Sequence, residues 1–104
     1  MNTQTTTTPP PQSWVLVGGR HAMPPNRGNI WDHVNPAEWA AGNIPKAAEA
    51  FIRDAAANSI NIIVTGFGPA LAEALRIVFY YNRSATLWHF NPTNQTYWPQ
   101  SLKA

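Results

Sequence analysis

The sequence predicts a small α/β protein with a Rossmann-like sheet and the element order β-α-β-α-β-β. Short apolar runs typical of buried strands alternate with longer amphipathic segments typical of helices. Proline residues stand where these helices are expected to begin, and glycine-containing turns follow two of the strands. Because strand-helix-strand units cross over with one hand, we expect parallel core strands, followed by an antiparallel hairpin at the C-terminal end.

The first strand is expected at Trp14–Val17, which is apolar throughout and is stopped by Gly18 and Gly19. The loop that follows covers residues 18–34. At about 17 residues it is longer than a usual connection, and loops of this length are commonly functional. We therefore look for ligand-binding residues in this loop.

Two helix starts follow the loop. In residues 35–38, Asn35 is placed to cap a helix, a proline occupies the first helical position, and Glu38 occupies the third. After a short turn, Pro45 is expected to begin a second helix that continues to about Ala57, with its apolar residues on one stripe.

The second half of the chain predicts two further strands and a hairpin. Residues 60–65 are β-branched and apolar at nearly every position, which is typical of a central parallel strand with both faces covered. A helix is expected at residues 69–81. Residues 85–90 then form the next strand, and a turn leads into its hairpin partner at residues 96–98.

Composition limits the classes of protein that remain. The 104 residues suffice for one domain, expected at residues 13–104 after a flexible Thr/Pro-rich tail at residues 1–12. The absence of cysteine excludes disulfides and thiolate zinc sites, and three widely spaced histidines predict neither a metal nor a cofactor. A net charge of +2 is too small for general nucleic-acid binding. Without a signal segment or an apolar run of about 20 residues, we expect a cytoplasmic protein that does not enter membranes.

A Gly-x-Gly turn joins the strand at residues 60–65 to the following helix. Thr65, Gly66, Phe67 and Gly68 would lie at the carboxyl end of this strand, where backbone N–H groups of a helix start can bind an anion. The third glycine of the dinucleotide-binding pattern is absent, because position 71 is leucine. The alternative is that the glycines only allow the chain to turn sharply.

A second candidate group leaves the first strand. If the first two predicted strands are parallel neighbours, Gly18 and Gly19 share an edge with Thr65, so that both turns border one crevice. Arg20 would then contact a phosphate, and His21 would donate a hydrogen bond or act as a general acid or base. The alternatives are a solvated Arg20 and a His21 that packs in the loop.

Two more residues of the long loop are ligand candidates. Arg27 is a second cation close to the predicted anion site, and Trp31 is an indole among polar residues that could face a ligand. The sequence argues against catalysis by paired carboxylates, because the chain has only five acidic residues and most are expected on helix surfaces.

The strand, the Gly-x-Gly-Pro-Ala-Leu segment that opens a helix at residues 66–71, and the aromatic hairpin together resemble CARF (CRISPR-associated Rossmann-fold) domains and the related SAVED sensors. This resemblance implies a homodimer that binds a cyclic oligoadenylate or a similar messenger in antiviral signalling. It places the phosphate cradle at residues 66–68 and the first-strand contacts at residues 19–21. The chain departs from the family in lacking an effector domain and in its long proline-containing loop.

Three functions are therefore expected alternatives. The first is a messenger-binding protein that acts as a sponge or regulator. The second is a ring nuclease, in which Arg20 and His21 would be catalytic while the ribose 2′-hydroxyl attacks its own phosphate. The third is a non-enzymatic interaction subunit that docks on a partner protein through the aromatic hairpin residues Trp88, Phe90 and Trp98.

Overall fold

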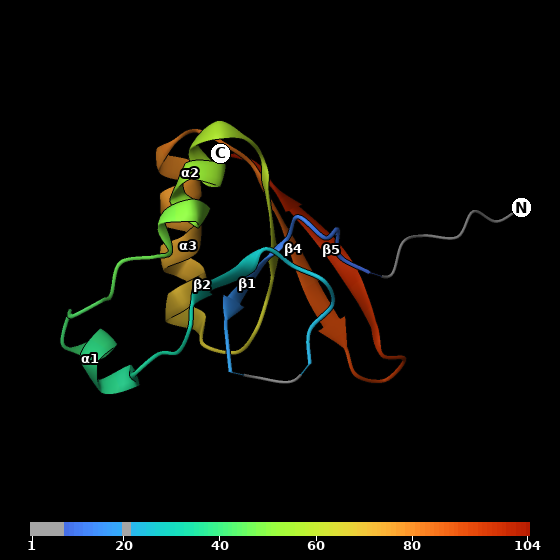
Figure 1. Cartoon of the computed structure of the whole chain (residues 1–104), viewed down its shortest axis with the longest axis horizontal. Helices are drawn as coiled ribbons and strands as arrows, with labels where there is room; N and C mark the ends of the chain where they lie inside the picture. The colour runs from blue at the N-terminus through green and yellow to red at the C-terminus, as the bar shows by residue number, and fades with distance from the viewer. Residues whose placement is uncertain (1–7, 20–21) are drawn as a thin grey trace, which may run out of the picture.

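The structure of the chain is a computed structural model that describes residues 8–19 and 22–104. Five strands form one sheet in the order β2-β1-β3-β4-β5, and three helices accompany it (Figure 1). None of the helices in the described part of the chain has the length and apolar character that a membrane span requires. The elements are β1 (Trp14–Val17), β2 (Gly28–Trp31), α1 (Pro36–Ala40), α2 (Glu49–Ala57), β3 (Ile60–Ile63), α3 (Gly68–Tyr80), β4 (Ala85–Asn91) and β5 (Thr96–Leu102).

Strand directions confirm the predicted fold class. β1 pairs in parallel with both β2 and β3, β3 pairs in parallel with β4, and β5 runs antiparallel to β4. The C-terminal hairpin is therefore present, and β5 continues to Leu102 although it contains Pro99. As predicted, the sheet has a parallel core and one antiparallel edge.

The order of elements differs from the prediction at β2, which lies inside the expected loop. Only Ile30 and Trp31 of its four residues are apolar, so the segment carries little strand signal by itself. Its partners make it a strand: β1 pairs along one edge, and on the other edge the backbone N–H of Ala48 donates to the Ile30 carbonyl at 2.9 Å.

The helices begin close to the positions that their start signals predict, with one exception. The Asn35 side chain caps α1 by accepting from the backbone N–H groups of Ala37 and Glu38, as predicted. The second helix begins at Glu49 rather than at Pro45. Residues 45–48 instead run beside β2, where the Pro45 carbonyl accepts from the indole Nε1 of Trp31 at 2.9 Å.

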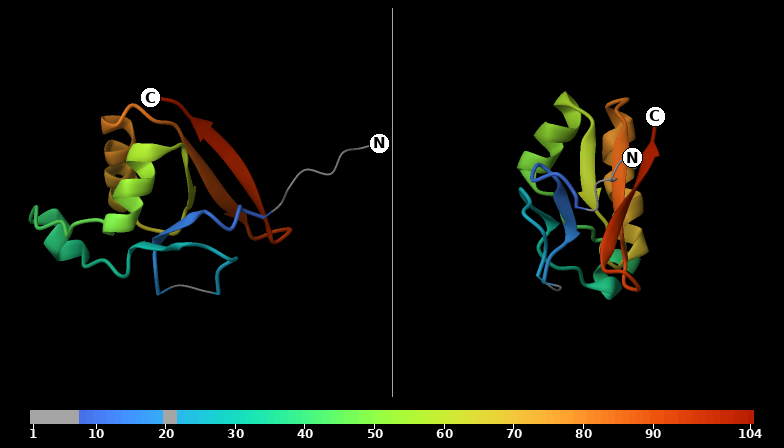
Figure 2. Two further views of the ribbon diagram at one scale, coloured as in Figure 1. Left: turned by 45° about the horizontal axis from the view of Figure 1, so that its top comes forward. Right: turned by 90° about the vertical axis from the view of Figure 1, so that its right-hand side faces the viewer.

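One face of the sheet carries the main core. Helices α2 and α3 both lie on this face, and the hairpin β4–β5 extends beyond them (Figures 1 and 2). The connections β2–β3 and β3–β4 step in the same direction across the sheet, so right-handed crossovers place both helices on the same side. Trp14 meets the fully buried Phe51 of α2 edge-on, with ring centroids 5.9 Å apart.

The opposite face is covered by a loop instead of a helix. The connection β1–β2 steps in the other direction, so the same handedness sends that connection across this second face. A small buried cluster of Val15, Ile63 and Trp88 lies there, and Met23 of the loop and Tyr97 of β5 pack against it. The sheet thus has a helix-covered face and a loop-covered face.

Candidate functional site

The chain leaves β1 and β3 in opposite directions. After β1 it crosses the loop-covered face to reach β2, whereas after β3 it enters α3 on the helix-covered face to reach β4. In open α/β sheets, ligands bind outside the carboxyl ends of the strands at such a switch point, because the two diverging connections leave a crevice between them. The β1–β3 boundary is the switch point of this sheet.

Thr65 holds the two sides of the switch point together. Its hydroxyl accepts from the backbone N–H of Val17 at 2.9 Å and donates to the Val17 carbonyl at 3.0 Å. The side chain therefore continues the β1–β3 pairing past the last backbone pair. This geometry confirms that the first two predicted strands are parallel neighbours and that Gly18 and Thr65 share one edge.

Gly18 and Gly19 turn the chain out of β1. Gly18 donates its backbone N–H to the Trp31 carbonyl at 2.9 Å, and a Cβ added there would lie 2.3 Å from the Asn29 side-chain nitrogen. Gly19 has a φ of +74°, a backbone conformation that residues with a side chain rarely adopt. Backbone geometry thus accounts for both glycines, and both lie at the predicted crevice.

A pocket of about 310 Å³ opens at this edge on the loop-covered face. The loop contributes Ala22 and Met23, β3 and the turn after it contribute residues 63–66, and the hairpin contributes Phe90 and Tyr97. The rings of Phe90 and Tyr97 are neighbours, with centroids 5.1 Å apart and planes tilted by 57°. The pocket therefore joins the switch point to an aromatic wall.

The aromatic wall has one polar group. Burial raises the pKa of the Tyr97 hydroxyl above its ordinary value, so this hydroxyl stays protonated and able to donate a hydrogen bond at neutral pH. Phe90 keeps 47 % of its surface exposed. A partly exposed phenyl ring beside a phenol suits a planar aromatic ligand that also carries a polar group.

The Gly-x-Gly turn contributes to the site through Gly66, which lines the pocket. Phe67 directs its ring into the protein, where it meets Trp39 edge-on with centroids 5.2 Å apart. Phe67 also has a φ of +126°, a conformation that is strained for a bulky side chain. The residue with a positive φ in this turn is therefore Phe67 rather than either glycine, and the phosphate cradle at residues 66–68 stays a prediction.

The start of α3 has fewer donors than a typical anion-binding helix. Pro69 has no N–H group, and the N–H of Ala70 donates to the Phe67 carbonyl at 3.1 Å. Proline starts the helix well, as predicted, but it also removes a donor. A phosphate at this turn would thus depend on contacts from the neighbouring loop.

Arg20 and His21, the predicted catalytic pair, lie outside the described residues. They separate Gly19 from Ala22 in the sequence, and Ala22 lines the pocket. Among the described residues, no group of three histidine, aspartate or glutamate side chains is placed to hold a metal ion.

Arg27 lies away from the predicted crevice, which corrects the expectation. It precedes β2 and therefore lies at the amino end of the parallel strands, opposite the pocket. Its Nε is 2.8 Å from Asp54 Oδ2, and its guanidinium lies over the Trp14 ring, 5.7 Å from the centroid. Sequence proximity to Arg20 was misleading because the connection between β1 and β2 returns the chain to the amino end of the strands before Arg27.

Trp31 is a core residue of β2 rather than an exposed ring in an open loop. Only 4 % of its surface is exposed, and its ring meets Trp39 edge-on at 5.1 Å. Its polar Nε1 is already bonded to the Pro45 carbonyl. The unrecognised strand β2 explains the difference, since a residue expected in an open loop is instead part of the sheet.

The aromatic hairpin divides between core and surface. Trp88 is only 5 % exposed and donates its Nε1 to Asn61 Oδ1 at 3.0 Å, so it is unavailable to a partner protein. Phe90 lines the pocket, whereas Trp98 is half-exposed and stacks on His89 with centroids 4.4 Å apart. The sequence placed Phe90 on a surface for a partner protein, and its role in a pocket was missed.

Met23 and Tyr97 were also missed as site residues. Neither has a sequence signal of its own, because each reaches the pocket through tertiary packing on the cluster of Val15, Ile63 and Trp88.

Comparisons with protein-family models, with curated proteins and with solved structures found no match. The resemblance to CARF domains stays a prediction.

Proposed function

We propose that this chain binds a nucleotide in the switch-point pocket, with the cyclic oligoadenylates as the first class to test. The observation that carries the proposal is the position of the pocket. It lies where the connections after β1 and β3 diverge, and it has the rings of Phe90 and Tyr97 as one wall.

The aromatic wall would receive the base. A volume of about 310 Å³ is at the lower end of the range for small-ligand pockets, which suits one base and its sugar better than a dinucleotide. Stacking on aromatic side chains contributes roughly 1–3 kcal/mol per base. The protonated Tyr97 hydroxyl would donate to a base or ribose oxygen.

The phosphate would lie at the strand ends. Gly19 on one side and Gly66 on the other keep side-chain bulk away from this edge, so that a charged group can approach the backbone. Arg20 and His21 directly follow Gly19 in the sequence, and an arginine can bind phosphate through two parallel hydrogen bonds. Both residues belong to the proposal as phosphate contacts.

The test is a calorimetric titration of the full chain with AMP, adenosine, inorganic phosphate and cyclic di-, tri-, tetra- and hexa-adenylate. Binding is expected for at least one compound that contains both base and phosphate, and neither part alone should match it. Heats that stay flat for every compound would remove the proposal.

A matched pair of variants locates the site. Phe90→Ala and Trp98→Ala each remove a half-exposed ring from the same hairpin, but only Phe90 lines the pocket. Loss of one stacking contact should weaken nucleotide binding by roughly 5- to 100-fold in Phe90→Ala and leave it unchanged in Trp98→Ala. Equal affinities in the two variants would place the ligand elsewhere.

Cleavage of a bound cyclic messenger is a separate outcome. Chromatography after incubation would show linear products if the chain is also a ring nuclease, and those products should disappear in Arg20→Ala and His21→Ala. Intact ligand after prolonged incubation would limit the function to binding.

A further inference from the structure

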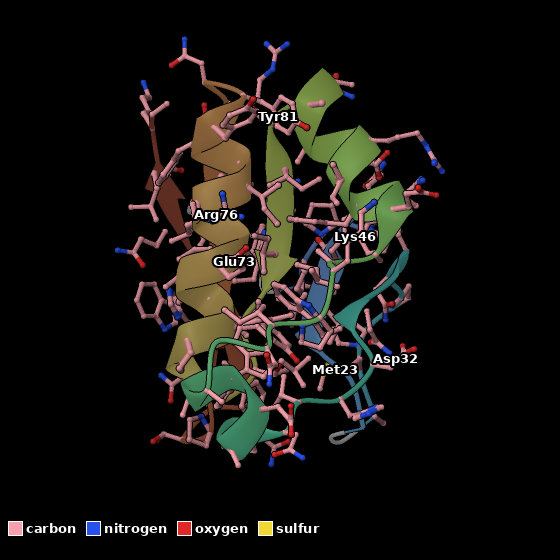
Figure 3. The ribbon with its side chains drawn as sticks, turned by 90° about the vertical axis from the view of Figure 1, so that its left-hand side faces the viewer. Met23, Asp32, Lys46, Glu73, Arg76 and Tyr81 are labelled. Carbon is pink, nitrogen blue, oxygen red and sulfur yellow. The ribbon has the colours of Figure 1, made fainter. Side chains whose placement is uncertain are left out.

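Residues 35–44 form an arm between β2 and α2. The arm contains α1, which stands away from the sheet in Figure 1 and lies at the foot of α3, below the labelled Glu73, in Figure 3. Trp39 is buried, whereas all other residues of the arm are exposed. Among the described residues, the hydrogen bonds of the arm join members of the arm itself. One buried side chain therefore attaches the arm to the rest of the protein.

Trp39 packs between β2 and the turn that follows β3. Its ring meets Trp31 and Phe67 edge-on, with centroids 5.1 Å and 5.2 Å apart. Its indole Nε1 is buried and has no hydrogen-bond partner among the described residues. A buried N–H group without an acceptor costs free energy, because it has lost its hydrogen bond to water. The docked position of Trp39 therefore combines good ring contacts with an unsatisfied polar group.

Phe67, the residue beneath Trp39, has an unfavourable backbone conformation. Its φ is +126° and its ψ is 87°, values that a bulky residue keeps only where surrounding contacts hold it. Release of Trp39 would let Phe67 return to an ordinary conformation and would expose the indole N–H to water. Release of the arm therefore removes two costs that docking imposes.

The arm also has room to move. An apolar hollow of about 350 Å³ separates it from the first turns of α3. The arm lines this hollow with Pro36, Trp39 and Ala40, and the opposite wall includes Phe67 and Pro69. Protein interiors normally leave no gap of this size between packed elements. The arm is thus held by a small contact area beside open space.

The turn beneath Trp39 borders the switch-point pocket from its other side. Residues 63–66 line the pocket on the loop-covered face, whereas Phe67 contacts Trp39 and the main core. Gly66 and Phe67 share a planar peptide unit, so a new backbone conformation at Phe67 also moves the pocket wall at Gly66. We propose that the arm is a conformational switch, whose docking through Trp39 is coupled by Phe67 to the shape of the switch-point pocket.

The coupling has a definite direction. A ligand that rests on residues 63–66 holds the turn in its present form, and this form keeps Phe67 beneath Trp39. A bound ligand therefore favours the docked arm, and release of the arm lowers the affinity for the ligand by the same factor. This step rests on the proposed nucleotide site, whereas the dependence of the arm on Phe67 does not.

Hydrogen exchange of the arm amides in the full chain, measured by mass spectrometry, tests the switch without a ligand. Phe67→Gly removes the ring beneath Trp39 and should speed arm exchange by roughly 5- to 150-fold, the usual range of such couplings. Phe79→Ala is the matched control, because it removes another partly buried ring of the same core at the far end of α3. It should leave arm exchange unchanged. The exchange of α2 and α3 in the same samples reports any loss of overall stability.

Gly66→Ala tests the coupling from the pocket side. A Cβ at Gly66 would meet no atom of the described residues within 4 Å, so alanine fits the turn as it stands and disfavours other conformations. Arm exchange should slow by roughly 2- to 5-fold.

The last measurement adds the compound that binds in the calorimetric titration. Arm exchange should slow by roughly 5- to 150-fold in the wild-type chain and respond less in Phe67→Gly. Arm rates that ignore a bound compound would overturn the coupling. So would equal arm rates in Phe67→Gly and wild type, or an acceleration that Phe79→Ala or the whole chain shares. If no compound binds, the nucleotide proposal fails, and the ligand-free rates of the variants alone decide on the switch.

Discussion

The two ends of the parallel strands are built in different ways. At the amino end, Asp54 Oδ2 accepts from Trp14 Nε1 at 3.0 Å and pairs with Arg27 Nε at 2.8 Å, while Arg27 lies over the Trp14 ring. At the carboxyl end, Thr65 bonds to Val17, and beyond it the chain diverges around a pocket. Among the described residues, none of the side chains that line this pocket is charged.

The comparison of the two strand ends indicates that the volume of a hollow and the charges that line it are not enough to choose a ligand site. A hollow of about 410 Å³ also lies at the amino end, and it includes Arg27. Its arginine and carboxylate already satisfy each other, so an incoming anion would have to displace Asp54. At the carboxyl end, the divergence of two connections leaves a pocket that no side chain of the described residues fills. The topology of the sheet therefore favours the hollow at the carboxyl end as the ligand site.

The largest expected difference between the ends concerns two phenylalanines. Phe51→Ala removes a fully buried ring beneath Trp14 and should lower the free energy of unfolding by about 3–5 kcal/mol. Phe90→Ala removes a half-exposed ring and should cost less than about 1.5 kcal/mol while weakening nucleotide binding. Urea denaturation measures both changes, and equal losses would contradict the assignment of Phe90 to a ligand wall.

Asp54→Ala is expected to have the next largest effect. It leaves the indole N–H of Trp14 without its acceptor and Arg27 without its ion-pair partner, which should cost about 1–3 kcal/mol of stability. Glu49→Ala, on the same helix but in an exposed pair of 4.0 Å with Lys46, is the control and should change little. A stable Asp54→Ala protein would show that the amino end does not depend on this network.

Thr65→Val tests the closure at the carboxyl end. Valine keeps the shape of the side chain but leaves the Val17 N–H and carbonyl without the hydroxyl, which should cost about 1–2 kcal/mol. Thr65→Ser retains the hydroxyl and should recover most of that loss. Chemical denaturation that ranks valine equal to serine would mean that water replaces the hydroxyl bonds.

The smallest effect is expected in acid and comes from α3 rather than from either strand end. The Arg76 hydrogen bond holds the pKa of Glu73 below its ordinary value of 4.5. The pair therefore contributes stability above about pH 4.5, and this contribution is lost as the pH falls through the lowered pKa. Because solvent screens the pair, the loss should be below about 1 kcal/mol, and Arg76→Gln should abolish it. A loss of equal size in Arg76→Gln would assign the acid sensitivity to other groups.

Strands with both faces covered were predictable from the sequence. β1, β3 and β4 are dense in apolar residues because helices cover one face and the loop and hairpin cover the other. β2 was not predictable, since its strand character depends on hydrogen bonds from β1 and Ala48 rather than on its own residues. This one omission also misplaced Arg27 and Trp31.

The part of the candidate site at the strand ends could be predicted from the order of the strands. Parallel neighbours must end at the same edge, so Gly18, Gly19, Thr65 and Gly66 could be brought together from sequence alone. The aromatic wall could not, because Met23, Phe90 and Tyr97 meet only after the loop folds over the second face of the sheet. Tertiary packing of this kind has no periodic signature.

The most direct test of the nucleotide site is a ¹H–¹⁵N correlation spectrum of the full chain, titrated with AMP and cyclic tetra-adenylate. The account predicts shifts of the backbone amides of Gly18, Gly66 and Tyr97, with Arg27 and Asp54 unchanged. Shifts confined to Arg27 and Asp54 would move the ligand to the amino end and contradict the account, and so would spectra that stay unchanged with both compounds.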